Sequence, residues 1–220
     1  MSTWLPMVTA AVLAAAGARA APPKTERERL SYALGVDLGR RLRAMPLEVE
    51  PALVASGVED VLAGRTPVLA DEDVRAALEA MQAELKARQA ARLAAAVGER
   101  FLAENRKKDG VVTLPSGLQY RVVKPGDGPV ARDGAAVACH WRERLVDGTE
   151  LDSSYRRGGP TTVKLDGDVI AAWREVLRLM PEGSRWELFV PPHLAYGERG
   201  EGRVGPNATL VFELEVLAVR

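Results

Sequence analysis

Residue types that commonly carry out catalysis are sparse in this sequence. No serine stands in a Gly-x-Ser-x-Gly context and no His-Glu-x-x-His motif occurs, so two common hydrolase signatures are missing. The two histidines, His140 and His193, lie on separate segments, and the chain has a single cysteine. These residues do not make a metal-ligand pattern. We therefore expect neither a metal nor a cofactor.

One segment matches the glycine pattern of a dinucleotide-binding loop. Residues 200–205 read Gly-Glu-Gly-Arg-Val-Gly, but a loop of that kind follows a strand and opens a helix. Here Pro206 and Asn207 come next, and then a predicted strand. We therefore expect no nucleotide at this loop.

The sequence around the cysteine indicates a residue packed in the core rather than a reactive thiol. Cys139 lies two residues before Trp141 in a predicted strand, where alternate side chains share a face. We interpret Cys139 as a small buried hydrophobic residue, and a bridge between two chains is the alternative. A single cysteine rules out a disulfide within the chain.

The composition is that of a globular protein without an excess of either charge. The chain has 220 residues, of which 47% are hydrophobic and 27% are charged. Its 30 Lys and Arg residues balance 30 Asp and Glu residues. This balance argues against nucleic acid, or an anionic lipid surface, as a partner.

The aromatic residues divide the chain into two unlike halves. Eight of the eleven Trp, Tyr and Phe residues lie after residue 114. Fourteen of the 20 glycines lie at or after Gly110. Large aromatic surface is therefore concentrated in the second half of the chain.

The first 20 residues have the pattern of a secretory signal peptide. Residues 7–18 carry no charge, and Ala18 and Ala20 put small residues at positions −3 and −1 of a cleavage point before Ala21. The apolar stretch is too short for a helix that crosses a bilayer core of ~30 Å. We expect an exported bacterial protein, periplasmic, associated with the outer membrane or secreted, without a membrane span. An uncleaved anchor or a disordered tail is the alternative.

The first half of the chain predicts three helices. The expected ranges are 26–45, 51–64 and 71–108. At ~1.5 Å per residue the third helix would be roughly 55 Å long. Because so long a helix cannot lie entirely against a small core, we interpret residues 70–108 as a long connecting helix.

The first two predicted helices bury little surface by themselves. Residues 26–69 are fewer than the ~70–80 below which a single core is marginal. A second copy of the chain would hide a stripe of leucines with a four-residue repeat, namely Leu30, Leu34, Leu38 and Leu42. We therefore predict a helical dimerisation domain over residues 21–69 and a homodimer through residues 26–69.

The second half changes to the alternating periodicity of strands. We expect strands over residues 118–124, 136–146, 186–190 and 209–219, and one short helix over 168–180 that Asp168 caps and Pro181 ends. In the last strand Leu210, Phe212 and Leu214 share one face. The predicted fold class is α+β, with an antiparallel sheet wrapped around a single helix.

Residues 114–220 resemble the FKBP-type peptidyl-prolyl cis-trans isomerases. The linked motifs stand in the family's order: Leu114–Tyr120, Leu145–Thr149, Asp152–Ser154, Val169-Ile170 with Trp173, Ala195–Gly197 and Pro206–Phe212. Residues 30–39 and 101–105 are similar to the N-terminal part of the macrophage infectivity potentiator subgroup. The resemblance implies an isomerase domain over residues 109–220, exported and dimeric like that subgroup.

The resemblance also implies which residues form the site. Asp152, Tyr196 and Trp173 match the family's catalytic positions, with Trp173 as the pocket floor and the Tyr196 hydroxyl as a donor to the substrate. The matched substrate-binding positions are Trp141, Leu151, Val163, Val169, Ile170, Val204 and Phe212. The backbone N–H of Ile170 would be available to a substrate carbonyl. Macrolide inhibitors are further ligands that the family implies.

Several positions depart from the family pattern. Trp141 stands where a tyrosine is usual, Leu151 where an aromatic residue is usual and Val163 where a phenylalanine is common. Arg142-Glu143 replaces small residues, and Ala171-Ala172 replaces Pro-Gly. The expected pocket keeps its floor and loses aromatic walls, which predicts weaker activity or altered specificity.

Two functions follow from these patterns. The first is an isomerase that accelerates X-Pro isomerisation while exported proteins fold, with proline-containing unfolded or partly folded chains as partners. The alternative is a dimeric periplasmic chaperone that binds unfolded chains with weak or no isomerase activity. Tyr196, Trp173 and Asp152 favour the isomerase, whereas the altered walls favour the chaperone.

Overall fold

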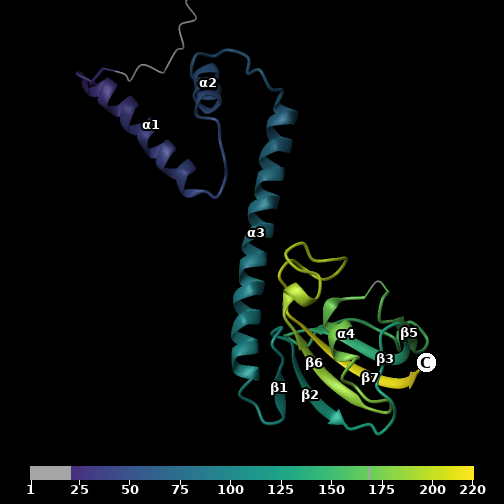
Figure 1. Ribbon diagram of the computed structural model, residues 1–220. Helices are drawn as coiled ribbons and strands as arrows, with labels where there is room; N and C mark the ends of the chain where they lie inside the picture. The colour runs from purple at the N-terminus through teal and green to yellow at the C-terminus, as the bar shows by residue number, and fades with distance from the viewer. Residues whose placement is uncertain (1–20, 168) are drawn as a thin grey trace, which may run out of the picture. The chain divides into compact units, whose positions relative to one another are not determined.

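The computed structural model describes residues 21–167 and 169–220. The predicted signal peptide, residues 1–20, and the expected helix cap Asp168 lie outside the described residues. The chain forms two compact units, the first ending at Ala70 and the second running from Asp71 to Arg220 (Figure 1).

The first unit contains two helices that end where their sequence signals predict. Helix α1 spans Glu26–Ala44 and begins with a capping box, in which the side chains of Thr25 and Glu28 each accept a hydrogen bond from the other residue's backbone N–H. Helix α2 spans Pro51–Leu62, with its proline in the first turn. Neither helix has a buried residue within the described chain, so packing inside this unit leaves most apolar side chains uncovered.

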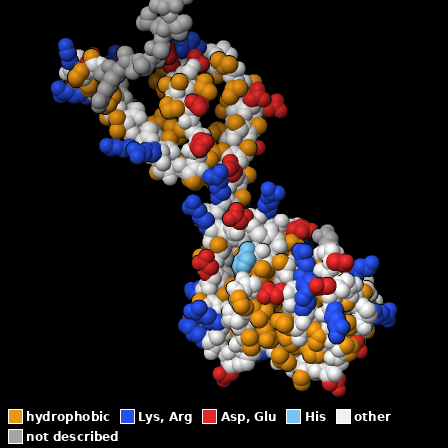
Figure 2. Space-filling view, viewed as in Figure 1, with side chains coloured by type: hydrophobic (Ala, Val, Ile, Leu, Met, Phe, Trp, Pro, Cys, Tyr) orange, Lys and Arg blue, Asp and Glu red, His pale blue; other side chains and the backbone are white. Residues whose placement is uncertain are grey.

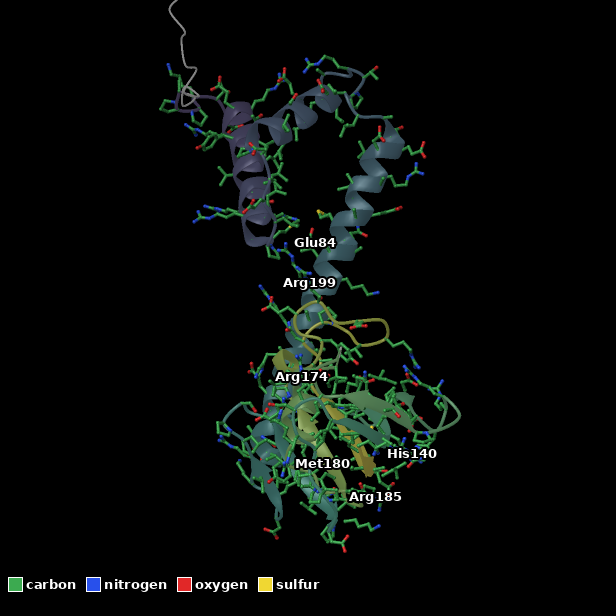
Figure 3. The ribbon with its side chains drawn as sticks, turned by 45° about the vertical axis from the view of Figure 1, so that its right-hand side comes forward. Glu84, His140, Arg174, Met180, Arg185 and Arg199 are labelled. Carbon is green, nitrogen blue, oxygen red and sulfur yellow. The ribbon has the colours of Figure 1, made fainter. Side chains whose placement is uncertain are left out.

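Helix α3 spans Asp71–Asn105, three residues short of the expected end. Its two buried residues, Gly98 and Asn105, lie in its last turns. There Phe101 contacts Phe189 with ring centroids 5.9 Å apart, and the Asn105 amide donates to Gln119 Oε1 at 3.0 Å. The C-terminal third of α3 therefore packs on the sheet that follows it, while earlier side chains such as Glu84 project from the helix (Figure 3).

After α3 the second unit contains a seven-stranded antiparallel sheet. Its strands are β1 (Val111–Thr113), β2 (Gln119–Lys124), β3 (Ala136–Leu145), β4 (Glu150–Ser153), β5 (Thr161–Lys164), β6 (Arg185–Val190) and β7 (Leu210–Val219). The order is β1-β2-β6-β7-β3-β4, and β5 pairs with β3 beside β4. Four of these strands match the expected ranges within one or two residues. The other three, β1, β4 and β5, have three or four residues each, too few to show a clear alternation.

The short helix differs from its predicted range. Helix α4 spans Ala171–Val176, not 168–180, and its N-cap is Ile170, whose backbone is extended at φ −58° and ψ 149°. After Val176 the chain continues in tight turns, with the Met180 N–H donating to the Val176 carbonyl. The helix therefore ends before Pro181. The turns keep Leu177 and Met180 buried where helical periodicity had put them.

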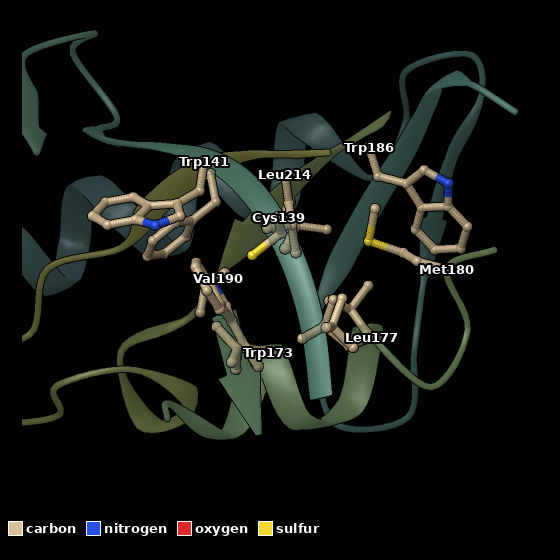
Figure 4. Packing of buried hydrophobic residues seen from close by; sticks show 14 of the residues in the cluster. Cys139, Trp141, Trp173, Leu177, Met180, Trp186, Val190 and Leu214 are labelled. Atoms are coloured by element: carbon tan, nitrogen blue, oxygen red, sulfur yellow. The ribbon is translucent and has the colours of Figure 1, made fainter. Parts of the chain in front are cut away.

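The core lies between α4 and the concave face of the sheet (Figure 4). From α4 and the turns after it come Trp173, Leu177 and Met180, and from the sheet come Cys139, Trp141 and Leu214, among others. Cys139 is fully buried, and burial raises the pKa of its thiol to about 12. The interpretation of Cys139 as a buried hydrophobic residue is confirmed.

Candidate active site

A cavity of ≈ 260 Å³ opens beside α4, at the end of the sheet where β3 and β7 meet the loop after β6. Six of the ten predicted site residues line it: Trp141, Val169, Ile170, Trp173, Tyr196 and Phe212. Three further lining residues, Glu143, Arg157 and Glu201, had not been assigned to the site. The cavity therefore combines an apolar base with a charged side.

Three aromatic rings form the apolar base. The ring of Trp173 meets Trp141 at 5.9 Å and 72°, and meets Phe212 at 5.8 Å and 79°, so it stands edge-on to both. Trp141 is held in turn, because its indole N–H donates to Thr161 Oγ1 at 3.1 Å. Trp173 is 7% exposed and its indole nitrogen has no partner among the described residues. The three rings of the base are thus packed on one another and largely buried.

Two hydrogen-bond donors belong to residues that line the cavity beside this base. Ile170 precedes α4, and its backbone N–H makes no hydrogen bond with the described residues 21–167 and 169–220. The Tyr196 hydroxyl likewise has no partner in that part of the chain. Burial, helped by the nearby carboxylates of Glu143 and Glu201, raises the pKa of Tyr196 to about 12. The phenol therefore stays protonated and can donate.

The loop that carries Tyr196 is fixed by its own backbone hydrogen bonds. Tyr196 follows the 3₁₀ turn Pro192–Leu194, and its carbonyl accepts from the Gly200 N–H at 3.2 Å. Gly200 has φ +69°, and a Cβ there would lie 2.2 Å from the Val204 carbonyl oxygen. The glycine pattern of residues 200–205 thus makes a tight turn that leads into β7, not into a helix.

Asp152 lies next to the cavity and not in its lining. The Arg157 guanidinium donates through Nε to Asp152 Oδ2 at 2.9 Å, and through Nη2 to the same oxygen. Chiefly through these bonds it holds the pKa of Asp152 below its usual value. The same guanidinium lies over the Trp141 ring, 5.2 Å from its centroid. Asp152 therefore acts on the cavity through Arg157.

Three other predicted residues lie behind the cavity wall. Leu151, Val163 and Val204 are buried in the hydrophobic core and are not among the residues that line the cavity. The Leu151 carbonyl accepts a 2.8 Å hydrogen bond from Arg203, which ties β4 to the loop after Tyr196. Their direct contact with a substrate stays a prediction from the resemblance.

Sequence reasoning missed the three charged lining residues. Glu143 could have been found, because it lies two residues after Trp141 on β3 and shares its face. Arg157 and Glu201 lie in irregular segments, where no periodicity predicts which way a side chain points.

Within the described part of the chain, no group of three or more His, Cys, Asp or Glu residues could hold a metal ion. No described helix has the length and hydropathy to cross a membrane.

Both halves of the chain match known protein families. Residues 27–122 match the domain amino-terminal to FKBP-type peptidyl-prolyl isomerase, and residues 128–217 match the FKBP-type peptidyl-prolyl cis-trans isomerase family. The chain is 36% identical to the outer membrane protein MIP of Legionella longbeachae, over 97% of each chain. It is 41% identical to the FKBP-type 22 kDa peptidyl-prolyl cis-trans isomerase of Escherichia coli, over 89% of this chain and 96% of that one.

A solved structure shows the same relationship in three dimensions. The crystal structure of FkpA from Escherichia coli matches with a TM-score of 0.62 and 33% sequence identity. The match covers 90% of this chain and 98% of that one. The sequence and the fold therefore point to the same group of proteins.

Proposed function

Since the chain belongs to the FKBP-type peptidyl-prolyl cis-trans isomerases and is an enzyme of that class, we propose that the cavity on Trp173 is its active site. One observation carries this assignment. The apolar base of Trp173, Trp141 and Phe212 shares the cavity with two donors that have no partner among the described residues, the Ile170 N–H and the Tyr196 hydroxyl. A proline ring can lie on the apolar base, and the carbonyl before the proline can accept a hydrogen bond from one of the donors.

The chemistry requires no nucleophile. Rotation about an X-Pro bond has a barrier of ~18–20 kcal/mol, because the planar amide is stabilised by resonance. A dry apolar cavity destabilises the more polar planar amide relative to the twisted one. Lowering the barrier by ~4 kcal/mol would accelerate rotation roughly a thousandfold. The buried aromatic base of this cavity supplies the apolar surface.

The donors hold the twisted substrate. The proline ring lies on Trp173, a substrate carbonyl accepts from the Ile170 N–H, and the Tyr196 hydroxyl donates to a second substrate oxygen. Asp152 is a positioning residue, since it holds Arg157 against the Trp141 ring. Removing the Asp152 carboxylate would release that wall of the cavity.

The cellular role is proposed from the N-terminal half. An exported isomerase of this kind acts on proline-containing chains that fold after export, in the periplasm or at the outer membrane. The predicted signal peptide supports this location, as does the printed name of the Legionella relative, an outer membrane protein. Macrolides are proposed as inhibitors from the family alone. A chaperone without isomerase activity is not favoured, because relatives over most of the chain are named as isomerases.

Assembly as a homodimer is proposed from the surface of α1 and α2. Leu30 and Leu34 are each 63% exposed, and Leu53 on α2 is 73% exposed. Leu38, Leu42, Val54 and Val58 line an apolar hollow of ≈ 1030 Å³ in the same unit. Figure 2 shows hydrophobic side chains at the surface of these helices. Such a surface is typical of an interaction site, and a second copy would cover it.

A paired refolding assay tests the active site. The protein is expected to accelerate a proline-limited refolding reaction. Tyr196→Phe should lower the rate enhancement about tenfold, the effect of losing one donor worth ~1.5 kcal/mol. Trp173→Ala should lower it further. Glu215→Gln, on the other face of the sheet, is the matched control and should leave it unchanged. Suppressed aggregation with no acceleration by the wild-type protein would contradict the assignment.

A further inference from the structure

Glu143 lies on the inner face of the sheet, in register with apolar residues on β7 and β6. In the register of the sheet Glu143 lies opposite Phe212 on β7 and opposite Asp152 on β4. Phe212 in turn lies opposite Leu188 on β6. Since cross-strand partners share a face, the Glu143 side chain points to the same side as Phe212. The register therefore directs a carboxylate into the cavity.

This carboxylate is buried and incompletely satisfied. Glu143 is 6% exposed, and its Oε1 atom has no hydrogen-bond partner among the described residues. A buried charge without a partner is unfavourable by several kcal/mol, on the order of the penalty for an ion in a medium of low dielectric constant. The side chain nevertheless lines the cavity beside Trp141 and Tyr196. The carboxylate is thus an unpaired acceptor group in the wall of the cavity.

The charges around Glu143 do not neutralise it. Two other carboxylates, Asp152 and Glu201, face it, and Arg157 is the one cation in the described lining of the cavity. Arg157 is already committed to Asp152 and to the Trp141 ring. Burial first, and then the charge of Asp152, raise the pKa of Glu143 to about 7.

The remaining nearby cations are engaged elsewhere. Arg203 donates to the Leu151 carbonyl at 2.8 Å, and Arg156 donates to the same carbonyl at 3.5 Å. The Tyr196 phenol is neutral across the physiological range. The described lining of the cavity therefore holds two carboxylates, Glu143 and Glu201, and one guanidinium, Arg157, which is already paired with Asp152.

We propose that Glu143 forms a cation subsite in the active site, so that the enzyme prefers X-Pro bonds flanked by Lys or Arg. The inference rests on the cavity being the isomerase site. A Lys or Arg side chain next to the proline would lay its methylenes along the apolar base and bring its charged head to the Glu143 carboxylate. The occupant supplies the hydrogen bond that the buried carboxylate lacks. The enzyme would prefer a cationic substrate side chain because that side chain pairs with the Glu143 carboxylate.

Peptide kinetics test the subsite. The probes are short unstructured peptides in which Lys, norleucine or Glu stands directly before or directly after one proline. Norleucine matches the Lys stem without its charge. At pH 8 the wild-type kcat/KM for the better Lys peptide should exceed that for norleucine about tenfold, and the Glu peptide should be the poorest substrate. In Glu143→Gln the Lys-to-norleucine ratio should fall to about one.

The pH dependence provides a second readout. The Lys preference of the wild type should grow between pH 6 and pH 8, because Glu143 ionises in this range while Lys, with a pKa near 10.4, stays charged. Glu143→Gln should show a ratio independent of pH. Glu215→Gln, with the same chemical change outside the cavity, should behave like the wild type.

A binding titration separates the two possible failures. Binding of each peptide is followed by tryptophan fluorescence, since Trp141 and Trp173 line the cavity. If both wild type and Glu143→Gln catalyse isomerisation with the same Lys-to-norleucine ratio of kcat/KM, the proposed subsite is wrong and the active-site assignment stands. Glu143-dependent binding of the Lys peptide without isomerisation would keep the subsite and overturn the active-site assignment. If Glu143→Gln weakens binding of the Lys, norleucine and Glu peptides equally, the proposed subsite is also wrong.

Discussion

At the scale of single residues, the pKa of Glu143 couples the stability of the fold to pH. In the unfolded chain a glutamate has its ordinary pKa of 4.5, whereas in the fold the value is about 7. Between these values the folded state holds a proton that the unfolded state has released. Stability from this group is therefore fully present below pH 4.5, falls as pH rises and is lost above pH 7.

The first prediction concerns the free energy of unfolding of Glu143→Gln. Between pH 5 and pH 8 the wild type should lose about 1–2 kcal/mol more than the variant, because Glu143 gives up its proton within this range in the folded state. Urea denaturation at several pH values measures this difference. The Glu215→Gln control should follow the wild type. Parallel curves for wild type and Glu143→Gln would show that the carboxylate is not perturbed.

At the scale of elements, the contact between α3 and the start of β7 depends on one glycine. A Cβ on Gly98 would lie 2.1 Å from Thr209 Oγ1 and 2.9 Å from its Cβ. Thr209 is 3% exposed and directly precedes β7, so it cannot move aside easily. The absence of a side chain at Gly98 is what allows the helix to approach the sheet.

The second prediction follows from this close approach. Gly98→Ala should destabilise the protein by about 1–3 kcal/mol through overpacking, although alanine favours a helix interior by about 1 kcal/mol. Gly57→Ala in α2 is the matched control, because nothing lies within 4 Å of a Cβ there. Gly57→Ala should be neutral or stabilising in urea denaturation. Equal stability of the two variants would mean that α3 does not pack closely on Thr209.

At the scale of the whole molecule, the cavity and the exposed leucines belong to different units. Every residue that lines the cavity lies in the unit Asp71–Arg220, whereas Leu30, Leu34 and Leu38 lie on α1. Isomerisation of a short peptide needs only the cavity. Assembly and peptide turnover should therefore be separable by mutation.

The third prediction tests this separation. Leu34→Asp should convert the proposed dimer to a monomer, because it puts a charge into an apolar interface. The mass in solution, measured by light scattering, should fall by about half, while kcat/KM for a short X-Pro peptide stays unchanged. Arg40→Asp, also exposed on α1, is the control and should remain dimeric. A wild-type protein that is monomeric at all concentrations would rule out the dimer.

Local patterns in the sequence determined the elements that are long enough to show a period. The leucine repeat predicts α1, and the alternation of Leu210, Phe212 and Leu214 predicts β7. Linked motifs also identified six of the residues that line the cavity, because short stretches such as Val169-Ile170 keep their spacing wherever the chain folds. The fold class and the aromatic base of the site were predictable for this reason.

Only the tertiary structure decided the charged side of the site. Arg157 and Glu201 reach the cavity from irregular segments, and Asp152 acts through Arg157 from outside the lining. The burial of Glu143 depends on Phe212, Asp152 and the loop after Tyr196, which meet only in the folded chain. A pKa and an unpaired oxygen are properties of such non-local surroundings, so no spacing along the sequence can determine them.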